Sequence, residues 1–305
     1  MRVPSQLLIA LFCTQSGAAA DMPPIGRIVV FGDLHLESAV RELLPPVPVS
    51  LGDADGENLR KKLAASSSWR QSDMTWVCCE SAGTAILYVG VRATDRRPQF
   101  RPTPTGAIRL DDEDLAIYDR LMELNHEAVT TGRSGPKDEA RRIEDQVMAR
   151  AGVRAARWRE VALNSGDKRH RAAAIHLAPY GAKDQALADA LAAASQDADA
   201  LVRNNAVRAM SVLARSSRDS SHVRLDPTPL LNLFDSVHWT DWNKASFALE
   251  ALTEASDPKL LAEIAARATG PLRQIANWPP MHSEPGSVIL KRVGSEGLLN
   301  KPVPK

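Results

Sequence analysis

The sequence predicts an α+β fold, in which a small β-α-α-β-β module at residues 21–97 precedes an α-helical solenoid at residues 137–297. Two features lead to this prediction. Short β-rich runs alternate with turn-forming residues and amphipathic helices in the N-terminal part. Farther along, one Ala-rich helical pattern recurs at intervals typical of helical repeats. The chain of 305 residues, 44% of them hydrophobic, is long enough to bury one or two cores.

Residues 1–20 have the layout of a cleavable secretory signal. A basic start is followed by an apolar run too short to span a bilayer, and small residues precede Asp21. We therefore expect export, to the periplasm or out of the cell, with cleavage near Ala20. A lipoprotein signal at Cys13 is the alternative, but Phe12 stands before that cysteine, where a small residue is expected.

The module at residues 21–97 begins with a β-rich run and ends with two more that are separated by Ser-Ala-Gly-Thr, a sequence typical of a hairpin turn. Two helices are expected between the first strand and the hairpin, on either side of a turn at Gly52. The predicted elements are strand Ile25–Phe31, helices Leu36–Leu44 and Glu57–Ala65, and strands Thr75–Glu80 and Ala85–Arg92.

That order, with the segments IGRIVVFGDLHLESAVRELL, LGD, ENLRKKLAASSSW and AILYVGV, is similar to the polypeptide-transport-associated (POTRA) module of envelope proteins. The resemblance covers about residues 25–92 and implies partner binding by strand addition at a free sheet edge. No membrane barrel follows the module here, so the transport role of that family is not implied. A generic small α/β sandwich with the same order is the alternative.

Residues 98–136 are predicted to be a linker that carries one helix, Asp111–Gly132. Pro and Thr at residues 103–106 favour an irregular connection, and the acidic first turn of the helix suits the positive end of its dipole. At the other end of the chain, Trp278–Lys305 is Pro-rich and is expected to be irregular apart from a short helix at Val288–Val293. We expect residues 298–305 to be a disordered tail.

The strongest helical pattern lies between Asp199 and Ser216, in DALVRNNAVRAMSVLARS. Its apolar residues share one face of a helix, and its polar residues lie off that face. The apolar set is Val202, Ala206, Ala209, Met210 and Leu213, and the polar set is Arg203, Asn204, Arg208 and Ser211.

The same pattern recurs 32 residues earlier and 39 residues later when the segments are aligned on Ala206. The matching positions are Ala174 and Leu177 in the earlier segment, and Ala245, Ala248 and Leu252 in the later one. Shorter apolar helices precede these segments, and a further pair begins after them. They are expected at Trp158–Leu163, Ala186–Ala194, Leu230–Phe234 and Leu260–Ala266. Helix pairs at such a period bury their apolar faces by stacking on the next pair.

The run DADALVRNNAVRAM resembles the HEAT repeat, whose second helix opens with an acidic turn, a Val-Arg pair and a spaced Ala. The resemblance covers about residues 137–297, and an irregular helical bundle is the alternative. It implies a scaffold whose second helices line a concave surface for a protein partner. Polar residues off the apolar face are then the candidate contacts: Arg203, Asn204, Arg208, Asn243 and Lys244.

No motif for a nucleophile, a phosphate loop or a dinucleotide site occurs in the sequence, so no catalytic residue, cofactor or metal is predicted. Cys78 and Cys79 are adjacent and are expected to be free thiols, with a strained disulfide between them as the alternative. His126-Glu127 is a single potential ligand pair, too few for a dinuclear metal site.

The formal net charge of +1 gives no reason to expect nucleic acid as a partner. Residues 133–171 are rich in Arg, but their acidic residues are interspersed, so paired surface charges explain most of this excess. An acidic partner or an anionic lipid is the alternative. The rival to the scaffold function is an envelope enzyme with a site between the module and the solenoid.

Overall fold

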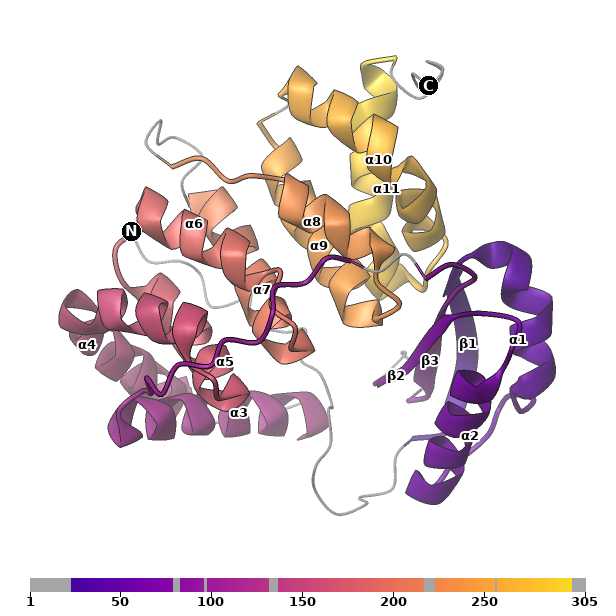
Figure 1. Cartoon of the computed structure of the whole chain (residues 1–305), viewed down its shortest axis with the longest axis horizontal. Helices are drawn as coiled ribbons and strands as arrows, with labels where there is room; N and C mark the ends of the chain where they lie inside the picture. The colour runs from indigo at the N-terminus through magenta and orange to yellow at the C-terminus, as the bar shows by residue number, and fades with distance from the viewer. Residues whose placement is uncertain are drawn as a thin grey trace. The chain divides into compact units, whose positions relative to one another are not determined.

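The computed structural model describes residues 23–78, 83–95, 98–131, 137–216, 223–255 and 257–297. Within these ranges the chain forms eleven α-helices and one three-stranded sheet, with the strands near the N-terminus (Figure 1). The α+β composition predicted from the sequence is therefore confirmed. The predicted signal at residues 1–20 and the predicted tail at 298–305 lie outside the described residues.

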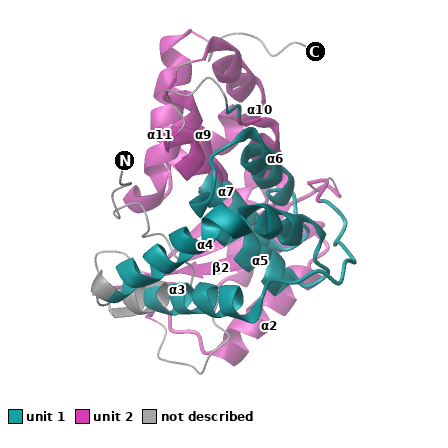
Figure 2. Ribbon diagram, turned by 90° about the vertical axis from the view of Figure 1, so that its left-hand side faces the viewer, with its two compact units in different colours: residues 1–14, 101–209, 220–224 teal, residues 15–100, 210–219, 225–305 magenta. Residues whose placement is uncertain are grey.

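The chain divides into two compact units that do not follow the predicted boundaries (Figure 2). Of the described residues, the first unit contains 101–209 and 223–224, and the second contains 23–100, 210–216 and 225–297. The N-terminal sheet module therefore forms one unit with the C-terminal helices. The sequence interpretation had joined those helices to the other repeats.

The first unit is helical. It contains α3 (Asp112–Thr131), α4 (Lys137–Asn164), α5 (Lys168–Leu177), the short 3-10 helix η3 (Ala178–Tyr180), α6 (Gln185–Ala194) and the first part of α7 (Ala200–Ser216). The helix predicted at 111–132 corresponds to α3, and the one at 186–194 to α6. The helix predicted at 158–163 is the end of α4, which is much longer because its polar N-terminal turns also stay helical.

The predicted apolar face of α7 is buried. Val202 and Ala206 are both 0% exposed, and Ala209, Met210 and Leu213 are also buried. The matching residues of α5 and of α9 (Trp239–Thr253), a helix of the second unit, are buried too, except Leu252, which is partly exposed. The alignment of the three helices therefore identifies equivalent faces.

A common hydrogen bond precedes α5, α7 and α9. In each case the backbone N–H of the residue just before the helix donates to a side-chain oxygen two residues earlier. The pairs are Asp167 to Ser165 Oγ (3.2 Å), Asp199 to Asp197 Oδ1 (2.8 Å) and His238 to Ser236 Oγ (3.0 Å). These positions are spaced by 32 and 39 residues, so the local structure recurs at the intervals predicted from the sequence.

A second hydrogen bond also recurs at these helix starts. A long side chain in the first turns reaches back to the backbone carbonyl six residues earlier. The donors and acceptors are Arg171 to Ser165 O (3.0 Å), Arg203 to Asp197 O (2.9 Å) and Trp242 to Ser236 O (2.8 Å). A buried carbonyl needs a partner, and a guanidinium or an indole N–H supplies it equally well. The solenoid arrangement itself stays a prediction.

Asp197 is a buried acidic residue of the first unit whose carboxylate accepts three hydrogen bonds. Its carboxylate accepts from Arg171 Nε (2.9 Å) and Nη2 (3.0 Å) and from the backbone N–H of Asp199. Both partners of the ion pair are buried, with 1% and 3% exposure. The pair joins α5 to the start of α7.

The segment predicted as a linker packs against the first unit before α3 begins, as the extended trace in Figure 1 shows. Arg101 N donates to Gln196 O (2.6 Å) and Gly106 N donates to Asn164 O (3.1 Å). Further along, Leu110 N donates to His170 Nδ1 (3.1 Å). Pro and Thr exclude a helix or an inner strand here, but they leave backbone groups that still pair with neighbouring loops.

The second unit contains a mixed sheet with the order β1-β3-β2. Strand β1 (Ile25–Gly32) runs parallel to β3 (Ala85–Arg92), and β2 (Gln71–Val77) is antiparallel to it. The predicted element order and hairpin are confirmed. Strand β2 begins four residues earlier than predicted because polar residues 71–73 pair with the end of β3, as an edge strand permits.

One face of this sheet packs against α1 (Glu37–Leu43) and α2 (Asp53–Ala65), and a 3-10 turn, η2 (Leu34–Leu36), precedes α1. Val40 and Leu63 of these helices are buried against Leu87, Val89 and Val91 of β3. Helix α2 begins earlier than predicted, with acidic residues in its first turn that suit the helix dipole.

The other face packs against helices from the C-terminal part of the chain. They are the 3-10 helix η4 (Leu233–Asp235), α9, α10 (Pro258–Ala276) and α11 (Pro280–Ser295), and the short α8 (Thr228–Asn232) packs on α9 and α10. The rings of Phe31 and Trp242 lie 5.0 Å apart, and those of Tyr88 and Trp239 also lie 5.0 Å apart. The side-chain amide of Gln274 bonds both backbone groups of Gly32, at 3.0 Å each.

Helix α11 corrects the sequence interpretation, which expected residues 278–305 to be irregular apart from 288–293. Pro280 occupies the first helical turn, where its missing N–H costs no hydrogen bond. Pro285 lies inside the helix, where it removes one backbone bond. Packing compensates for the lost hydrogen bond. Gly286 allows the backbone of α10 to approach closely, and Ile289 and Val293 are buried.

The buried His282 of α11 should make stability depend on pH. Its Nδ1 lies 2.7 Å from Tyr88 Oη, at hydrogen-bond distance, and burial, with the nearby charge of Lys244, lowers its pKa to about 4. Between pH 4 and pH 6.5 the unfolded chain takes up a proton that the folded chain does not, so stability is lost as pH falls through this window. We expect His282→Asn, whose amide offers Tyr88 both a donor and an acceptor, to reduce this loss by up to about 1.4 kcal/mol per pH unit.

Denaturant unfolding of both proteins at pH 7, 6 and 5 measures the effect. Equal pH dependence in the wild-type protein and the variant would show that His282 is not kept neutral by the fold.

Candidate functional site

The structure separates the five candidate contact residues into two groups. Arg203, Asn243 and Lys244 are buried, with exposures of 1%, 1% and 6%. The sequence interpretation treated them as accessible, which this burial corrects. Helical spacing identifies one core face, but α9 is buried on almost all sides, so polar residues off its apolar face are enclosed as well. Asn204 and Arg208 of α7 are partly exposed.

Arg208 of α7 is partly exposed, and its charge is felt by aromatic side chains on three other elements of the first unit. Its positive charge acts on Tyr118 of α3, His176 of α5 and Tyr180 of η3. The rings of Tyr118 and His176 meet edge to face, with centroids 5.4 Å apart. Tyr118 also hydrogen-bonds the side chain of Asn205. We call these five residues the Arg208 cluster.

Arg208 has no acidic partner among the described residues, unlike Arg150 and Arg171 of the same unit. Arg150 pairs with Asp114 Oδ1 at 2.6 Å, and Arg171 pairs with Asp197. Across the part of the chain that the structure describes, Arg208 forms no ion pair and no hydrogen bond. Burial lowers the pKa of its guanidinium, and the two tyrosines oppose this shift. The group nevertheless stays charged, because arginine does not lose its proton in proteins.

The other members of the cluster are neutral at physiological pH. Burial and, to a lesser extent, the charge of Arg208 together lower the pKa of His176 to about 3. Burial raises the pKa of both tyrosine hydroxyls. Asp119 acts on Tyr118, but it is paired with Arg169 at 2.6 Å. Arg208 is therefore the one charged member of the cluster, and Arg169 and Asp119 act on Tyr118 from outside it.

Asn205 holds Tyr118 in place. Its Nδ2 donates to Ala172 O at 3.0 Å, so this amide is tied to α5 while it bonds the Tyr118 hydroxyl. By contrast, His176 and Tyr180 form no hydrogen bond with the described part of the protein. Both are partly exposed. Tyr118 is thus fixed by internal bonds, whereas His176 and Tyr180 are not.

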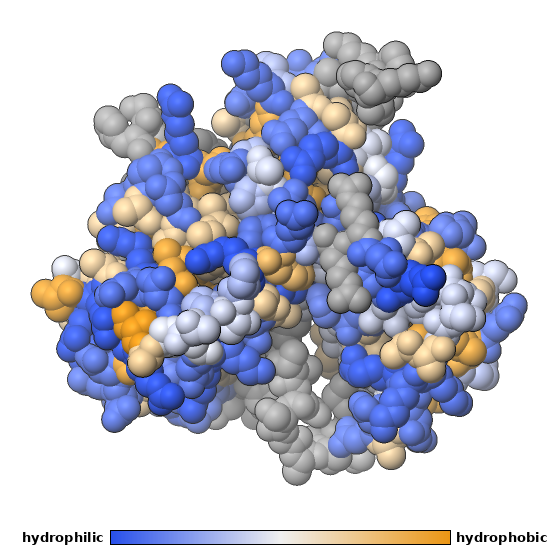
Figure 3. All heavy atoms as spheres, viewed as in Figure 1, coloured by the Kyte–Doolittle hydropathy of each residue, from blue (hydrophilic) through white to orange (hydrophobic). Residues whose placement is uncertain are grey.

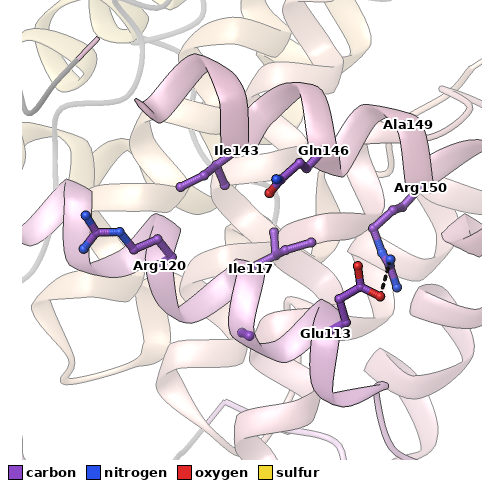
Figure 4. A pocket seen from close by; sticks show the side chains of 8 residues that line it. Glu113, Ile117, Arg120, Ile143, Gln146, Ala149 and Arg150 are labelled. Carbon is purple, nitrogen blue, oxygen red and sulfur yellow. Dashed lines mark ion pairs between the residues drawn. The ribbon is translucent and has the colours of Figure 1, made fainter. Parts of the chain in front are cut away.

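A pocket of about 430 Å³ between α3 and α4 is a second candidate (Figure 4). Ile117 and Ile143 face each other across it, and charged side chains stand at its ends. Those charges are paired: Arg150 contacts Glu113 at 2.7 Å, and Arg120 contacts Glu139 at 2.8 Å. Since each cation already has an acid, this pocket offers a ligand little beyond a small apolar floor.

Exposed hydrophobic residues give no better site. On the face seen in Figure 3, hydrophobic residues occur in small patches among hydrophilic ones. Val153 and Met148, at 83% and 61% exposure, both lie on α4. Isolated apolar residues of this kind are normal on protein surfaces.

The remaining sequence predictions concern cysteines, metals and membranes. Cys78 is disulfide-bonded, so it is not the free thiol expected; the other two cysteines, Cys13 and Cys79, lie outside the described residues. The side chains of His126 and Glu127 lie outside them too. The described residues contain no group of three or more potential ligands that could hold a metal. No helix among them is both long and apolar enough to cross a bilayer.

Comparison of the chain with known protein families, with curated proteins and with solved structures finds no match. The site must therefore be interpreted from its own residues.

Four members of the Arg208 cluster were missed by sequence reasoning. The signal for His176 was present, because it lies 32 residues before Arg208 and so occupies the equivalent position of the preceding helix. Stacked repeats bring equivalent positions together. Tyr118 and Tyr180 lie outside the repeating pattern, on α3 and η3, so no spacing in the sequence points to them.

Arg208 should contribute nothing to stability, in contrast to the paired Arg150. A partly buried cation without an acid carries a desolvation cost, which Arg208→Met removes while keeping the length of the side chain. We expect the melting temperature of this variant to be unchanged or raised. Arg150→Met leaves the buried Asp114 without its cation and should cost about 3 kcal/mol.

Thermal melting followed by circular dichroism compares the two variants. If Arg208→Met lowered the melting temperature as much as Arg150→Met, Arg208 would be a structural residue and not part of a ligand site.

Proposed function

We propose that the protein is an exported, non-enzymatic scaffold that binds a protein partner through its helical repeats, with Arg208 and Asn204 of α7 in contact with the partner. The observation that supports this most is the unpaired, partly exposed guanidinium of Arg208. Unpaired cations in such positions are costly to the free protein, and a bound partner can supply the missing charge. Export is proposed from the signal predicted at residues 1–20.

The chemistry of the Arg208 cluster favours binding over catalysis. A general base or acid works best with a pKa near the operating pH. His176, with a pKa of about 3, is too weak a base to take up a proton at neutral pH, and both tyrosine hydroxyls are harder to ionise than usual. What the cluster can do at neutral pH is hold an anionic group.

The resemblances to HEAT repeats and to the POTRA module fit the same proposal. Both kinds of module act chiefly by binding other proteins. The recurrence of the helix-start bonds before α5, α7 and α9 supports the repeat interpretation at the local level. Edge strand β2 offers a second docking element of the POTRA type, by strand addition.

A capture experiment tests the proposal with a matched control. The mature chain, its Asn204→Ser/Arg208→Ser variant and an Arg267→Ser variant are immobilised and exposed to a cell-envelope extract of the source organism. Arg267 is an exposed arginine of α10 paired with Glu263, so its loss should not matter. We expect one protein to be retained by the wild-type chain and the control, and to be depleted at least tenfold with the double variant.

Retention of the same proteins in equal amounts by all three chains would contradict a contact at Arg208 and Asn204. In that case the edge of β2 would be the next surface to test.

A further inference from the structure

We propose that α4 is a self-association surface, through which two copies of the chain pair as an antiparallel, two-fold symmetric dimer. This inference goes beyond the proposed function and does not depend on it. The surface consists of six exposed residues spaced by four, three, four, three and four positions, the spacing of the contact line between two packed helices. We call them the α4 seam: Arg142, Gln146, Ala149, Val153, Ala156 and Glu160.

The seam is not used by the fold of the first unit. The residues that α4 buries lie on another side of the helix: Ile143, Val147, Ala151, Ala155 and Trp158. Val153, in the middle of the seam, is 83% exposed. One exposed apolar residue is ordinary, but Val153 lies between Ala149 and Ala156, whose small side chains allow a second helix to come close.

The charges along this face complement each other when a second copy runs in the opposite direction. In a symmetric antiparallel pair, a step forward on one helix is matched by a step back on the other. If Ala149 lies opposite Val153 of the second copy, then Arg142 lies opposite Glu160. A parallel, in-register pair would instead set each charge against the same charge of the second copy.

A second pair of opposite charges follows from the same alignment, because Asp145 then lies opposite Arg157 of the second copy. In the free chain Arg157 pairs with Glu160 at 3.1 Å, and Arg142 lies 4.0 Å from Glu139. Both contacts are exposed and lie within one helix, where ion pairs contribute little to stability. Exchanging them for pairs between copies therefore costs little.

The pocket between α3 and α4 fits the same arrangement. Gln146 and Ala149 of the seam line it, and Ile117 and Ile143 face each other across it (Figure 4). Val153 of the second copy, opposite Ala149, lies beside this opening and can place its side chain there. The charges at the ends of the pocket are already paired, and an apolar side chain needs only the apolar floor.

The size of the surface sets the expected strength of the dimer. A single pair of helices buries less than the roughly 1,200–2,000 Å² of a standard interface. We therefore expect a weak, reversible dimer with a dissociation constant in the micromolar range.

Sedimentation velocity of the mature full-length chain, over a series of micromolar concentrations, should show a monomer–dimer equilibrium. Val153→Ser should weaken the dimer about tenfold or more, because symmetry removes two buried apolar side chains. Met148→Ser is the matched control. Met148 is another exposed apolar residue of α4, at 61% exposure, but it lies outside the seam, so its loss should change nothing.

A charge exchange tests the antiparallel alignment. Arg142→Glu sets acid against acid, and Glu160→Arg sets base against base, so each variant alone should dimerise about tenfold or more weakly. An equal mixture of the two variants should form a heterodimer, because each chain supplies the charge that the other needs. The double variant should dimerise with itself. Circular dichroism melting checks that each chain is folded, since exposed changes usually cost within about 0.5 kcal/mol.

Three results would overturn the inference. A wild-type chain that stays monomeric throughout the concentration series would exclude the dimer. The absence of a heterodimer in the mixture would exclude the antiparallel alignment. A dimer lost with Met148→Ser but kept with Val153→Ser would place the contact on a neighbouring face of α4. None of these results bears on capture through Arg208 and Asn204, so the two proposals fail separately.

Discussion

The buried ion pair between Arg171 and Asp197 is the interaction on which the first unit depends. It joins α5 to the residues just before α7, and the same Asp197 accepts the backbone N–H that starts α7 and, through its carbonyl, the side chain of Arg203. These bonds fix the rotation of α7 about its axis. That rotation in turn decides which residues of α7 are buried and which, such as Arg208, lie beside the aromatic side chains of neighbouring helices.

The recurring bonds at the starts of α5, α7 and α9 show how a repeated local structure is kept when the sequence changes. The function of the position is to give a buried carbonyl its donor, so Arg171, Arg203 and Trp242 can stand in equivalent places. The ion pair has no such tolerance. It needs an acid at 197, and the equivalent positions hold Ser165 and Ser236. The described structure thus combines a common local bond with one buried ion pair.

Two arginines of the same unit illustrate the difference between a structural and a binding residue. Arg171 is completely buried and its guanidinium is fully used by Asp197 and two backbone carbonyls. Arg208 is partly exposed and bonds neither an acid nor a carbonyl among the described residues. Helical spacing in the sequence does not distinguish Arg171 from Arg208, because both lie off the apolar face of their helices. Their different roles depend on which side chains of neighbouring elements lie close to each arginine.

Local patterns predicted the elements that depend on local sequence. The apolar face of α7, the order of the strands and helices in residues 25–92 and the hairpin all followed from spacing and turn residues. Contacts between distant segments were not predictable in this way. The packing of the C-terminal helices on the sheet has no local signal, although the uninterrupted apolar run of β3 is typical of a strand buried on both faces.

The candidate contact residues were predicted wrongly for a related reason. Amphipathic spacing assumes that a polar residue off the apolar face meets water. In α9 that assumption breaks down, and Asn243 and Lys244 are buried. The cluster around Arg208 depends on α3 and η3, which are outside the repeat, so only its His176 could have been inferred from the 32-residue spacing.

A double-mutant cycle on Arg171 and Asp197 tests the central claim of this account. Arg171→Met, Asp197→Asn and the double variant are compared by denaturant unfolding with the wild-type chain. Each single change leaves a buried group without its partner and should cost about 3–5 kcal/mol, whereas the double variant should cost no more than the larger single change. Single changes that each cost under about 1 kcal/mol, or costs that simply add, would show that the first unit does not depend on this pair.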